Sequence, residues 1–148
     1  MTKAFVKEFE VRWADLDPNR HLRHTSYNDY ATHVRFRYLE ENGFAARDFA
    51  ARELGPVIFR EETRFLKEVR MNETITVDIQ IAALTPEGDR FSMLHEVIRG
   101  DGIVAATVVV DGAWMDLRKR KLIPPPPELR DLLWALPKAE GFQGDNAP

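Results

Sequence analysis

Four side chains capable of acid–base chemistry lie close together in the segment VRWADLDPNRHLRHTSYNDY, residues 11–30. Asp15, Asp17, His21 and His24 stand between two apolar segments, and a proline follows the second aspartate. A carboxylate can attack a carbonyl carbon or activate a water for that attack, and a histidine can carry a proton. The segment is therefore either a solvated turn or the active site of an enzyme that acts on a carbonyl group.

Each of these residues also has a structural role open to it. Asp15 is expected to hydrogen-bond its own backbone, as aspartates in turns often do. Asp17 precedes Pro18 and can do the same. His21 is expected to pack against the turn, and His24 either faces a ligand or caps the helix that follows.

Composition excludes several classes of protein. The chain has 148 residues, enough for one domain with a sizeable core, and a net charge of −3, which indicates neither a nucleic acid nor a membrane partner. It has no cysteine, so disulfides and thiol nucleophiles are excluded. The first residues lack the apolar run of a signal peptide, and no segment is apolar enough to cross a membrane. We expect a cytoplasmic protein.

A strand, a turn and a long helix are predicted to position the four side chains. The strand covers residues 5–13, and the turn sequence DPN at 17–19 ends it. Ser26 and Asp29 fit a capping box at the start of the helix, and Gly43 fits its end. An apolar stripe at helical spacing runs along one face of this helix: Tyr27, Tyr30, Ala31, Val34 and Tyr38.

The second half of the chain alternates apolar and polar residues, which predicts antiparallel strands at 56–66, 73–84, 90–99, 103–110 and 114–123. The strand 103–110 is apolar on both faces, so we expect it to be central and covered on both sides. One amphipathic helix must bury its stripe against this sheet, which gives a two-layer α+β fold.

Shorter elements complete the prediction. A second short helix is expected within 46–55, and a stiff spacer at the prolines 124–127. A short amphipathic helix follows at 128–136, and the last ten residues are expected to be disordered. We assign residues 1–123 to the domain and 124–148 to a proline-rich C-terminal extension.

The segment from Asp17 to Tyr27 resembles the hotdog-fold acyl-CoA thioesterases of the 4-hydroxybenzoyl-CoA thioesterase type. That family carries aromatic-x-Asp-x-Asp, then typically Gly-His-Val-Asn-Asn, and a tyrosine that opens the central helix. The matching residues, without a gap from Asp17 onward, are Trp13, Asp15, Asp17, His21, Leu22 and Tyr27. The departures are Arg20 for the glycine and Arg23 and His24 for the asparagines, although a related branch also has histidine at the position of His24. In element order the resemblance covers roughly residues 5–123.

The resemblance implies an antiparallel sheet wrapped around one long central helix, and an enzyme that hydrolyses the thioester of an acyl-CoA or acyl carrier. Asp17 takes the place of the catalytic carboxylate. The backbone N–H at His24 would polarise the thioester carbonyl, and the His24 side chain would take part. The family also implies a homodimer joined edge to edge, possibly paired into a tetramer, with each site built from both chains.

Substrate-binding residues follow from the two ends of an acyl-CoA. The acyl group needs an apolar pocket, which we expect along Tyr27, Tyr30 and Val34, with Phe59 or Phe65 as the far wall. Phosphates need cations, and the run RKRK at 118–121, with Arg118 and Arg120, is the densest candidate. Core packing for the tyrosines and a solvated strand end for the basic run are the alternatives.

Other functions remain open. A non-catalytic acyl-CoA-binding hotdog protein would keep the pocket but not need Asp17. A hotdog hydratase or dehydratase needs an aspartate, four residues and a histidine, and Leu22 occupies that histidine position. A cystatin-like small-molecule binder shares the outline of one helix on a sheet. No two histidines have i, i+4 ligand spacing beside an acid, so we expect no metal and no cofactor.

Overall fold

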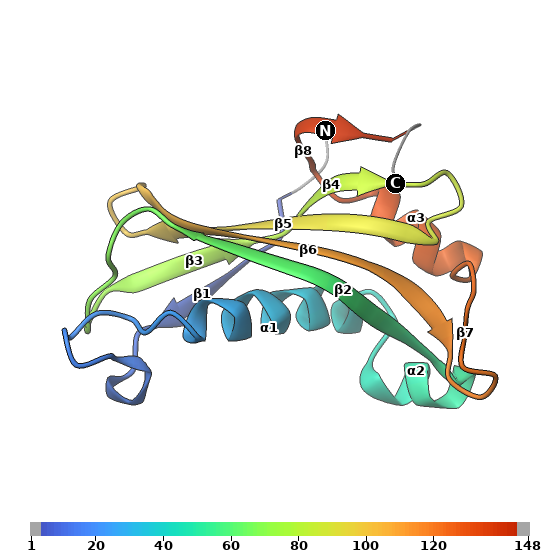
Figure 1. Ribbon diagram of the computed structural model, residues 1–148, viewed down its shortest axis with the longest axis horizontal. Coiled ribbons are helices and arrows are strands. Elements are labelled where there is room, and N and C mark those ends of the chain that lie inside the picture. Colours follow the sequence, from blue (N-terminus) through green and yellow to red (C-terminus); the bar gives the residue numbers. More distant parts are fainter. Residues whose placement is uncertain (1–3, 145–148) are drawn as a thin grey trace.

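A curved, largely antiparallel sheet wraps around one long helix, α1 (Ser26–Glu41), in the computed structural model, which describes residues 4–144 (Figure 1). This arrangement confirms the predicted α+β hotdog fold. Four residues of the predicted stripe are buried: Tyr27, Ala31, Val34 and Tyr38. Asn42 is the C-cap and Gly43 has φ +93°, so the helix ends where the sequence predicts.

The start of α1 differs from the prediction. Thr25 is the N-cap, and no side chain caps the helix. Ser26 is already helical, because its N–H donates to the carbonyl of Arg23 at 3.0 Å. Its hydroxyl is buried and has no hydrogen-bond partner within residues 4–144. The predicted capping box of Ser26 and Asp29 is therefore wrong.

Within residues 4–144, eight strands form one sheet (Figure 1). β5 (Arg90–Arg99) lies between β6 (Val104–Asp116) and the consecutive strands β3 (Thr74–Asp78) and β4 (Gln80–Leu84). β1 (Val6–Glu10) pairs with β3, and β2 (Leu54–Phe65) pairs with β6. β6 is central as expected, but its outward residues Thr107 and Val109 are only half-buried, so one chain covers only one face of it.

β1 and the strand predicted at 73–84 depart from their predicted extents, whereas β2 bends as expected. β1 ends at Glu10, because the chain then folds into a 3₁₀ turn, η1 (Trp13–Asp15), closed by the N–H of Asp15 on the carbonyl of Arg12. The predicted strand 73–84 breaks at Ile79 into β3 and β4. β2 has the expected bend, at a bulge between Ile58 and Arg60.

The C-terminal segment packs on the same core. The predicted second short helix is α2 (Ala46–Arg52), and after the short strand β7 (Lys121–Leu122) the chain forms α3 (Pro127–Trp134) and β8 (Lys138–Gln143). α3 buries Leu129 and Leu133, and β8 runs parallel to β4. The expected disorder of the last ten residues is wrong for 139–143, and residues 145–148 lie outside the described part.

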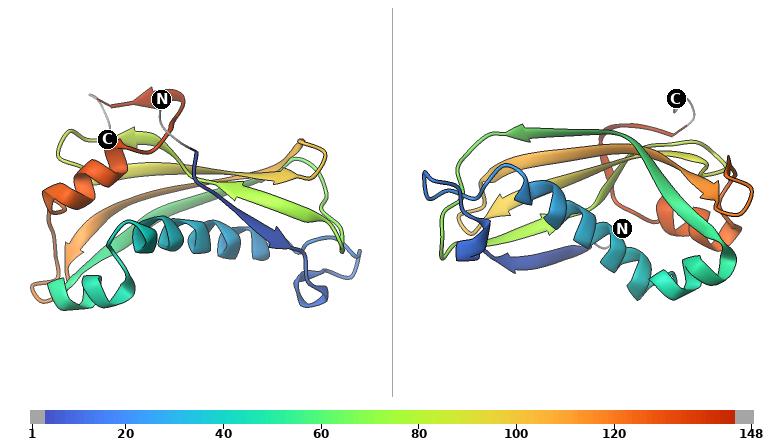
Figure 2. Two further views of the ribbon diagram at one scale, coloured as in Figure 1. Left: turned by 180° about the vertical axis from the view of Figure 1, so that it is seen from behind. Right: turned by 60° about the horizontal axis from the view of Figure 1, so that its bottom comes forward.

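Figure 2 shows α1 lying in the concave face of the sheet, with α2 and α3 near its C-terminal end. The loop that follows β1 lies at the N-terminal end of α1. Because the core fills the space between α1 and the sheet, this loop is fixed against two rigid elements. The loop carries Asp15, Asp17, His21 and His24.

Candidate active site

A shallow cavity of about 470 Å³ opens at the N-terminal end of α1. The loop after β1 contributes Asp17, His21 and His24, and the first turn of α1 contributes Tyr27. The end of β2 and the residues after it form the opposite wall, from Phe65 to Glu68. The cavity therefore brings together both predicted catalytic residues and two of the predicted substrate-binding residues.

The carboxylate of Asp17 is held by its own turn. Its Oδ1 accepts hydrogen bonds from the backbone N–H groups of Asn19 at 2.8 Å and His21 at 3.1 Å. The Asp17 N–H in turn donates to the carbonyl of His21 at 2.8 Å. Within residues 4–144, Oδ2 receives no hydrogen bond, so one oxygen is anchored and the other is available to a substrate or water.

The backbone conformation at Arg20 is one that glycine adopts more easily than other residues. Arg20 closes the turn through its N–H on the carbonyl of Asp17, at 3.0 Å, and its φ is +64°. Left-handed backbone costs a residue with a Cβ roughly 1–2 kcal/mol, a cost that glycine avoids. This chain adopts the left-handed conformation with arginine at that position.

The role of Asp15 differs from that of Asp17. It also differs from the prediction that Asp15 hydrogen-bonds its own backbone. Its side chain is buried and binds Arg12, with both carboxylate oxygens at 2.9 Å from guanidinium nitrogens. The Tyr30 hydroxyl donates to the same carboxylate at 2.8 Å. The hydrogen bond from Arg12 lowers the pKa of Asp15, so it stays ionised. Asp15 ties the loop to α1 through side chains and makes no local bond to its own backbone.

The backbone N–H groups just before α1 differ in whether they have a hydrogen-bond acceptor. The N–H of Ser26 donates to the carbonyl oxygen of Arg23, whereas the N–H of His24 donates to no other residue within 4–144. Free amides at a helix start, with the positive end of the helix dipole behind them, stabilise a developing oxyanion. The His24 side chain is exposed and lines the cavity, and it does not cap α1.

Two aromatic rings form the apolar wall of the cavity. Tyr27 and Phe65 meet edge to face, with ring centroids 5.3 Å apart. Burial of the Tyr27 ring, with smaller effects from Asp17 and Glu73, raises the pKa of its hydroxyl. Tyr27 is thus a neutral, largely apolar surface beside the Asp17 carboxylate.

The remaining residues predicted to line the acyl pocket lie elsewhere. Tyr30 stacks on Phe9 at 4.6 Å, and Val34 is fully buried in the core; neither is among the residues that line the Asp17 cavity. Phe59 follows Ile58 at the β2 bulge and lies under the guanidinium of Arg90, 5.1 Å from its ring centroid.

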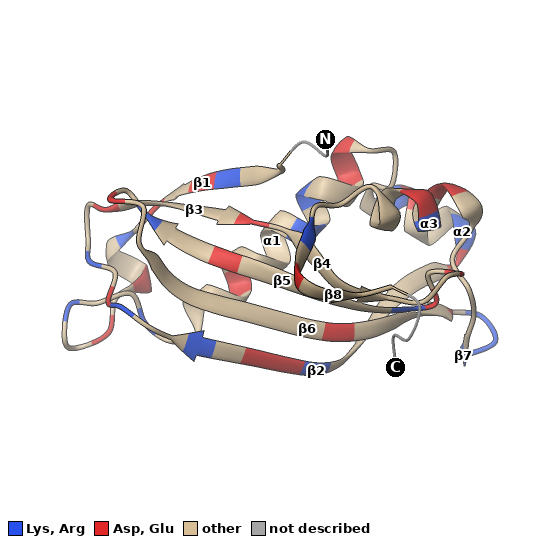
Figure 3. Cartoon of the chain, turned by 90° about the horizontal axis from the view of Figure 1, so that it is seen from above, with Lys and Arg blue, Asp and Glu red and all other residues tan. Residues whose placement is uncertain are grey.

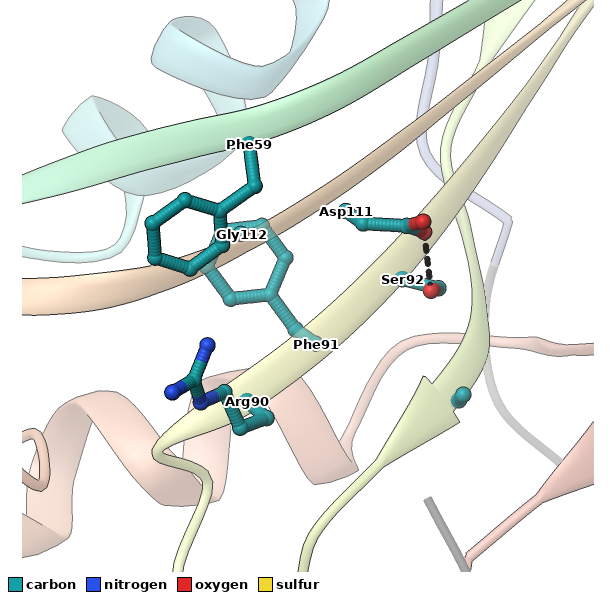
Figure 4. Close-up of a pocket in the computed structure, with 7 residues that line it drawn as sticks. Phe59, Arg90, Phe91, Ser92, Asp111 and Gly112 are labelled. Atoms are coloured by element: carbon teal, nitrogen blue, oxygen red, sulfur yellow. Dashed lines mark hydrogen bonds between the residues drawn. The ribbon is translucent and has the colours of Figure 1, made fainter. Parts of the chain in front are cut away.

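Figure 4 shows Phe59 and Arg90 at a hollow of about 190 Å³, together with the hydrogen-bonded pair Ser92 and Asp111. Ser92 and Asp111 alternate with the buried Met93 and Val110, so they point away from α1. Phe59 therefore belongs to the outer face of the sheet, not to the Asp17 cavity of the same chain.

The basic run lies far from Asp17 within one chain. Arg118 and Arg120 occupy the exposed turn between β6 and β7, stabilised by the Asp116 carboxylate, which accepts from the N–H groups of Arg118 and Lys119 at 2.9 Å. Figure 3 shows this basic turn beside β7, at the end of the molecule opposite the loop that follows β1. Lys67 is the cation that lines the Asp17 cavity itself.

A second cavity, of about 310 Å³, lies farther along α1 and was not predicted. Its α1 wall includes Thr32, Arg35 and Phe36, and its β2 wall includes Ile58 and Glu61. Arg35 donates to the ring nitrogen Nε2 of the fully buried His95 at 3.2 Å. His95 alternates with polar positions of β5 in register with the buried Met93 and Val97, a signal that could have placed it on the inward face, but no sequence pattern pairs it with Arg35.

Within residues 4–144, no three histidine, aspartate or glutamate side chains gather closely enough to hold a metal ion. In the same part of the chain, no helix has the length and apolarity that a membrane crossing requires.

Comparison with solved structures identifies the same fold in proteins of low sequence identity. A hypothetical protein from Staphylococcus aureus, solved in complex with CoA, has a TM-score of 0.84 at 18% identity, over 94% of this chain and 89% of that one. A 1,4-dihydroxy-2-naphthoyl-CoA thioesterase from Synechocystis has 0.79 at 14% identity, over 89% and 96%. A DHNA-CoA thioesterase from Staphylococcus aureus has 0.77 at 17% identity, over 87% of both chains. At these identities the likeness establishes the fold.

No curated protein sequence matches the chain. The sequence profile of the Thioesterase-like superfamily matches residues 11–133, which include the Asp17 loop, α1, the strands β2 to β7 and most of α3. This match spans most of the chain and agrees with the predicted family. The chain therefore belongs to the thioesterase-like superfamily, and its enzyme class is that of a thioester hydrolase.

Proposed function

We propose that this protein hydrolyses an acyl-CoA thioester with Asp17 as its catalytic carboxylate. The observation that carries the proposal is the cavity at the start of α1, which Asp17 and His24 both line, together with the His24 N–H, which donates to no other residue within 4–144. A thioester carbonyl placed there has a carboxylate on one side and an amide donor on the other. These are the two groups that acyl transfer requires.

Asp17 acts on the carbonyl carbon either directly or through a water. As a general base, Oδ2 takes a proton from the water whose oxygen attacks the carbonyl carbon, and the carbon–sulfur bond then breaks. As a nucleophile, Oδ2 attacks the carbonyl carbon, the carbon–sulfur bond breaks and the CoA thiolate leaves, so that Asp17 carries the acyl group as a mixed anhydride. Water then hydrolyses the anhydride, which releases the acid and restores the Asp17 carboxylate. The two bonds to Oδ1 fix the carboxylate in both cases, so little reorganisation is needed.

His24 supports the same reaction in two ways. Its backbone N–H donates to the oxyanion while the tetrahedral intermediate exists. Its exposed side chain orients the attacking water or protonates the departing thiolate. The thiolate is a good leaving group without help, so orientation of the water is the more useful role.

A second subunit would complete the site. β2 is a long edge strand whose outer side has no partner within residues 4–144, and exposed apolar side chains lie around it: Phe36, Ile58, Phe65 and Leu66. Open edges of this kind are commonly paired. We propose that two copies join along β2, so that each Asp17 cavity is closed by the partner.

The CoA phosphates then have two candidate cation sets. Lys67 lies in the Asp17 cavity of the same chain, and Arg118 with Arg120 would have to come from another copy, because they lie at the opposite end of their own chain. Replacing Arg118 and Arg120 by glutamate is expected to raise KM for acyl-CoA but not for an acyl-pantetheine that lacks the phosphates. An equal rise of KM for both substrates would show that the basic turn does not bind the CoA phosphates.

A panel of acyl-CoA esters with a thiol reagent tests the proposed function. We expect release of free CoA thiol from at least one aliphatic or aromatic ester, with loss of most of the rate in Asp17→Asn. Binding of the esters without any thiol release would instead favour an acyl-CoA-binding protein. Addition of water to an enoyl-CoA without thiol release would favour a hydratase.

A further inference from the structure

The second cavity contains the guanidinium of Arg35, which forms no ion pair with a carboxylate of residues 4–144. Arg35 lines the cavity beside α1, and within residues 4–144 no carboxylate oxygen lies within 4 Å of its guanidinium. Its two hydrogen-bond partners there are neutral: Nε2 of His95 at 3.2 Å and the Thr32 hydroxyl at 3.0 Å. A guanidinium has five N–H donors, so three are left for a ligand.

His95 cannot supply a negative partner and is held so that it accepts from Arg35. Its Nδ1 lies 2.7 Å from the carbonyl oxygen of Asp78, which can only accept, so Nδ1 carries the proton and Nε2 is the acceptor. Burial, and secondly the charge of Arg35, lowers the pKa of His95 to about 3. The imidazole is therefore neutral and orients the guanidinium without offsetting its charge.

Glu61 is the carboxylate whose charge reaches Arg35, but it is bound elsewhere. Its Oε1 accepts from the side-chain amide of Asn28 at 2.6 Å, and Asn28 also accepts from the hydroxyl of Thr63 at 2.5 Å. Burial lowers the pKa of Arg35, an effect that Glu61 only partly opposes. A further carboxylate beside the guanidinium would offset the cost of its burial.

The rest of the cavity is apolar and lies in line with the Asp17 cavity. Its other walls come from Leu39, Ile79, Met93 and Trp114. The same two elements, α1 and β2, line both cavities, and the bridge from Asn28 to Glu61 and Thr63 lies between them. From Ser26 to Arg35 the helix rises roughly 13 Å, at about 1.5 Å per residue. A flexible acyl chain can span that distance along the edge of β2.

We propose that this cavity is an acyl-binding subsite whose Arg35 selects acyl groups that end in a carboxylate. The inference rests on the proposed function and adds the substrate class, an acyl-CoA derived from a dicarboxylic acid. The apolar walls hold the methylene chain, and the guanidinium pairs with the terminal carboxylate. Hydrogen bonds to charged groups contribute enough to give a preference of about 10- to 100-fold.

The kinetic test uses CoA esters matched in length: hexanoyl with adipoyl, octanoyl with suberoyl, and decanoyl with sebacoyl. We expect the wild type to favour the carboxylate-bearing ester by about 10- to 100-fold in kcat/KM for at least one pair. Arg35→Met should abolish that preference and change the rate on the methyl-terminated ester by only a few fold. Equal kcat/KM within every wild-type pair, or a preference that survives in Arg35→Met, would overturn the proposal.

Two further variants separate a local effect from a general one. Arg37→Met removes a half-buried arginine of the same helix that pairs with Glu40 and Glu41, and should leave the preference unchanged. Glu61→Gln keeps the acceptor for Asn28 but removes the competing charge, so it should increase the preference for the carboxylate. Loss of the preference in Arg37→Met, or no increase in Glu61→Gln, would count against Arg35 as the selecting charge.

A binding measurement distinguishes failure of the subsite from failure of the proposed function. Free adipate, suberate and sebacate are titrated into wild type and Arg35→Met by calorimetry, which needs no hydrolysis. Binding to the wild type alone, without hydrolysis of any ester, would retain the subsite and refute the thioesterase. Hydrolysis without preference and without diacid binding would retain the thioesterase and refute the subsite.

Discussion

Two aspartates separated by one residue have opposite roles because their environments differ. Asp15 is buried, ionised and fully occupied by Arg12 and Tyr30. Asp17 is half-buried, uses one oxygen to hold its own turn, and lines a cavity with the other left for a ligand. Residue type and spacing alone do not distinguish them. The hydrogen-bond partners do.

The Asp15 bond network should be needed for stability more than for chemistry. Asp15→Asn keeps the shape of the side chain but loses the charged hydrogen bonds from Arg12, which contribute about 1.5–3 kcal/mol. We expect the free energy of unfolding, measured by urea denaturation, to fall by about that amount, with kcat reduced far less than in Asp17→Asn. Unchanged stability with lost activity would assign Asp15 to the reaction instead.

His95 should make stability depend on pH in a defined range. Its pKa is about 3 in the folded chain, against 6.5 for the ordinary histidine. Between these values the unfolded chain binds a proton that the folded chain does not, so stability falls as pH falls below 6.5. The loss is about 1.4 kcal/mol per pH unit, or about 2 kcal/mol from pH 7 to 5.

Urea denaturation of wild type and His95→Gln at pH 7, 6 and 5 measures this contribution. The glutamine cannot titrate, so the difference in unfolding free energy between the two proteins should shrink as pH is lowered. A difference that stays constant from pH 7 to 5 would show that His95 protonates equally in both states.

At the scale of elements, the C-terminal segment contributes to the core. α3 places Leu129 and Leu133 at 0% exposure in the cluster that also contains Val34 and Trp114. The hydroxyl of Tyr38, on α1, donates to the carbonyl of Leu132 at 2.6 Å. The proline stretch therefore leads the chain back onto the sheet and α1.

Leu133→Ala tests that contribution. A large-to-small change at a fully buried leucine costs about 2–5 kcal/mol of unfolding free energy. Leu122→Ala is the matched control, because Leu122 is 42% exposed on β7 and its replacement should cost at most about 0.5 kcal/mol. Equal small effects would mean that α3 is only loosely attached.

The sequence predicted those elements whose patterns are local. The apolar stripe and Gly43 defined α1, and the alternation from 73 to 99 defined the inward faces of β3, β4 and β5. Asp17 and His24 could be selected because the spacing to Tyr27 matched the family, and Arg20 adopts the left-handed conformation at its position.

What depends on tertiary contacts could not be predicted. Phe59 lies at a bulge, and a bulge changes the face on which a side chain lies without any signal in the alternation. The distance of Arg118 from Asp17 depends on the length and direction of β6. The segment KAEGFQ of β8 has little strand propensity of its own. It forms a strand because it pairs with the edge of β4.

At the scale of the whole molecule, β2 is an edge strand, and its outer side has no partner strand within residues 4–144. Its length, and the exposed Phe36 and Ile58 beside it, predict a homodimer in which the two edges pair. Pairing would also close the mouths of both cavities along α1 and β2.

Sedimentation at micromolar concentration tests this assembly. We expect twice the mass of the chain for the wild type, and a shift toward the monomer in Ile58→Glu, which places a charge at the proposed interface. Ile103→Glu, at a side chain that is 42% exposed before β6, is the control and should not change the mass. A monomeric wild type that hydrolyses acyl-CoA would refute a site shared between two chains.

The central claim is that the Asp17 carboxylate performs the reaction, and the kinetics of Asp17→Asn test it most directly. The amide keeps the shape and can still accept the bonds that hold the turn, but it has lost its basicity. On the best acyl-CoA ester we expect kcat to fall about 10²- to 10⁴-fold with KM nearly unchanged, whereas Asp131→Asn on α3 should match the wild type. An Asp17→Asn variant within a few fold of the wild-type kcat would contradict the account.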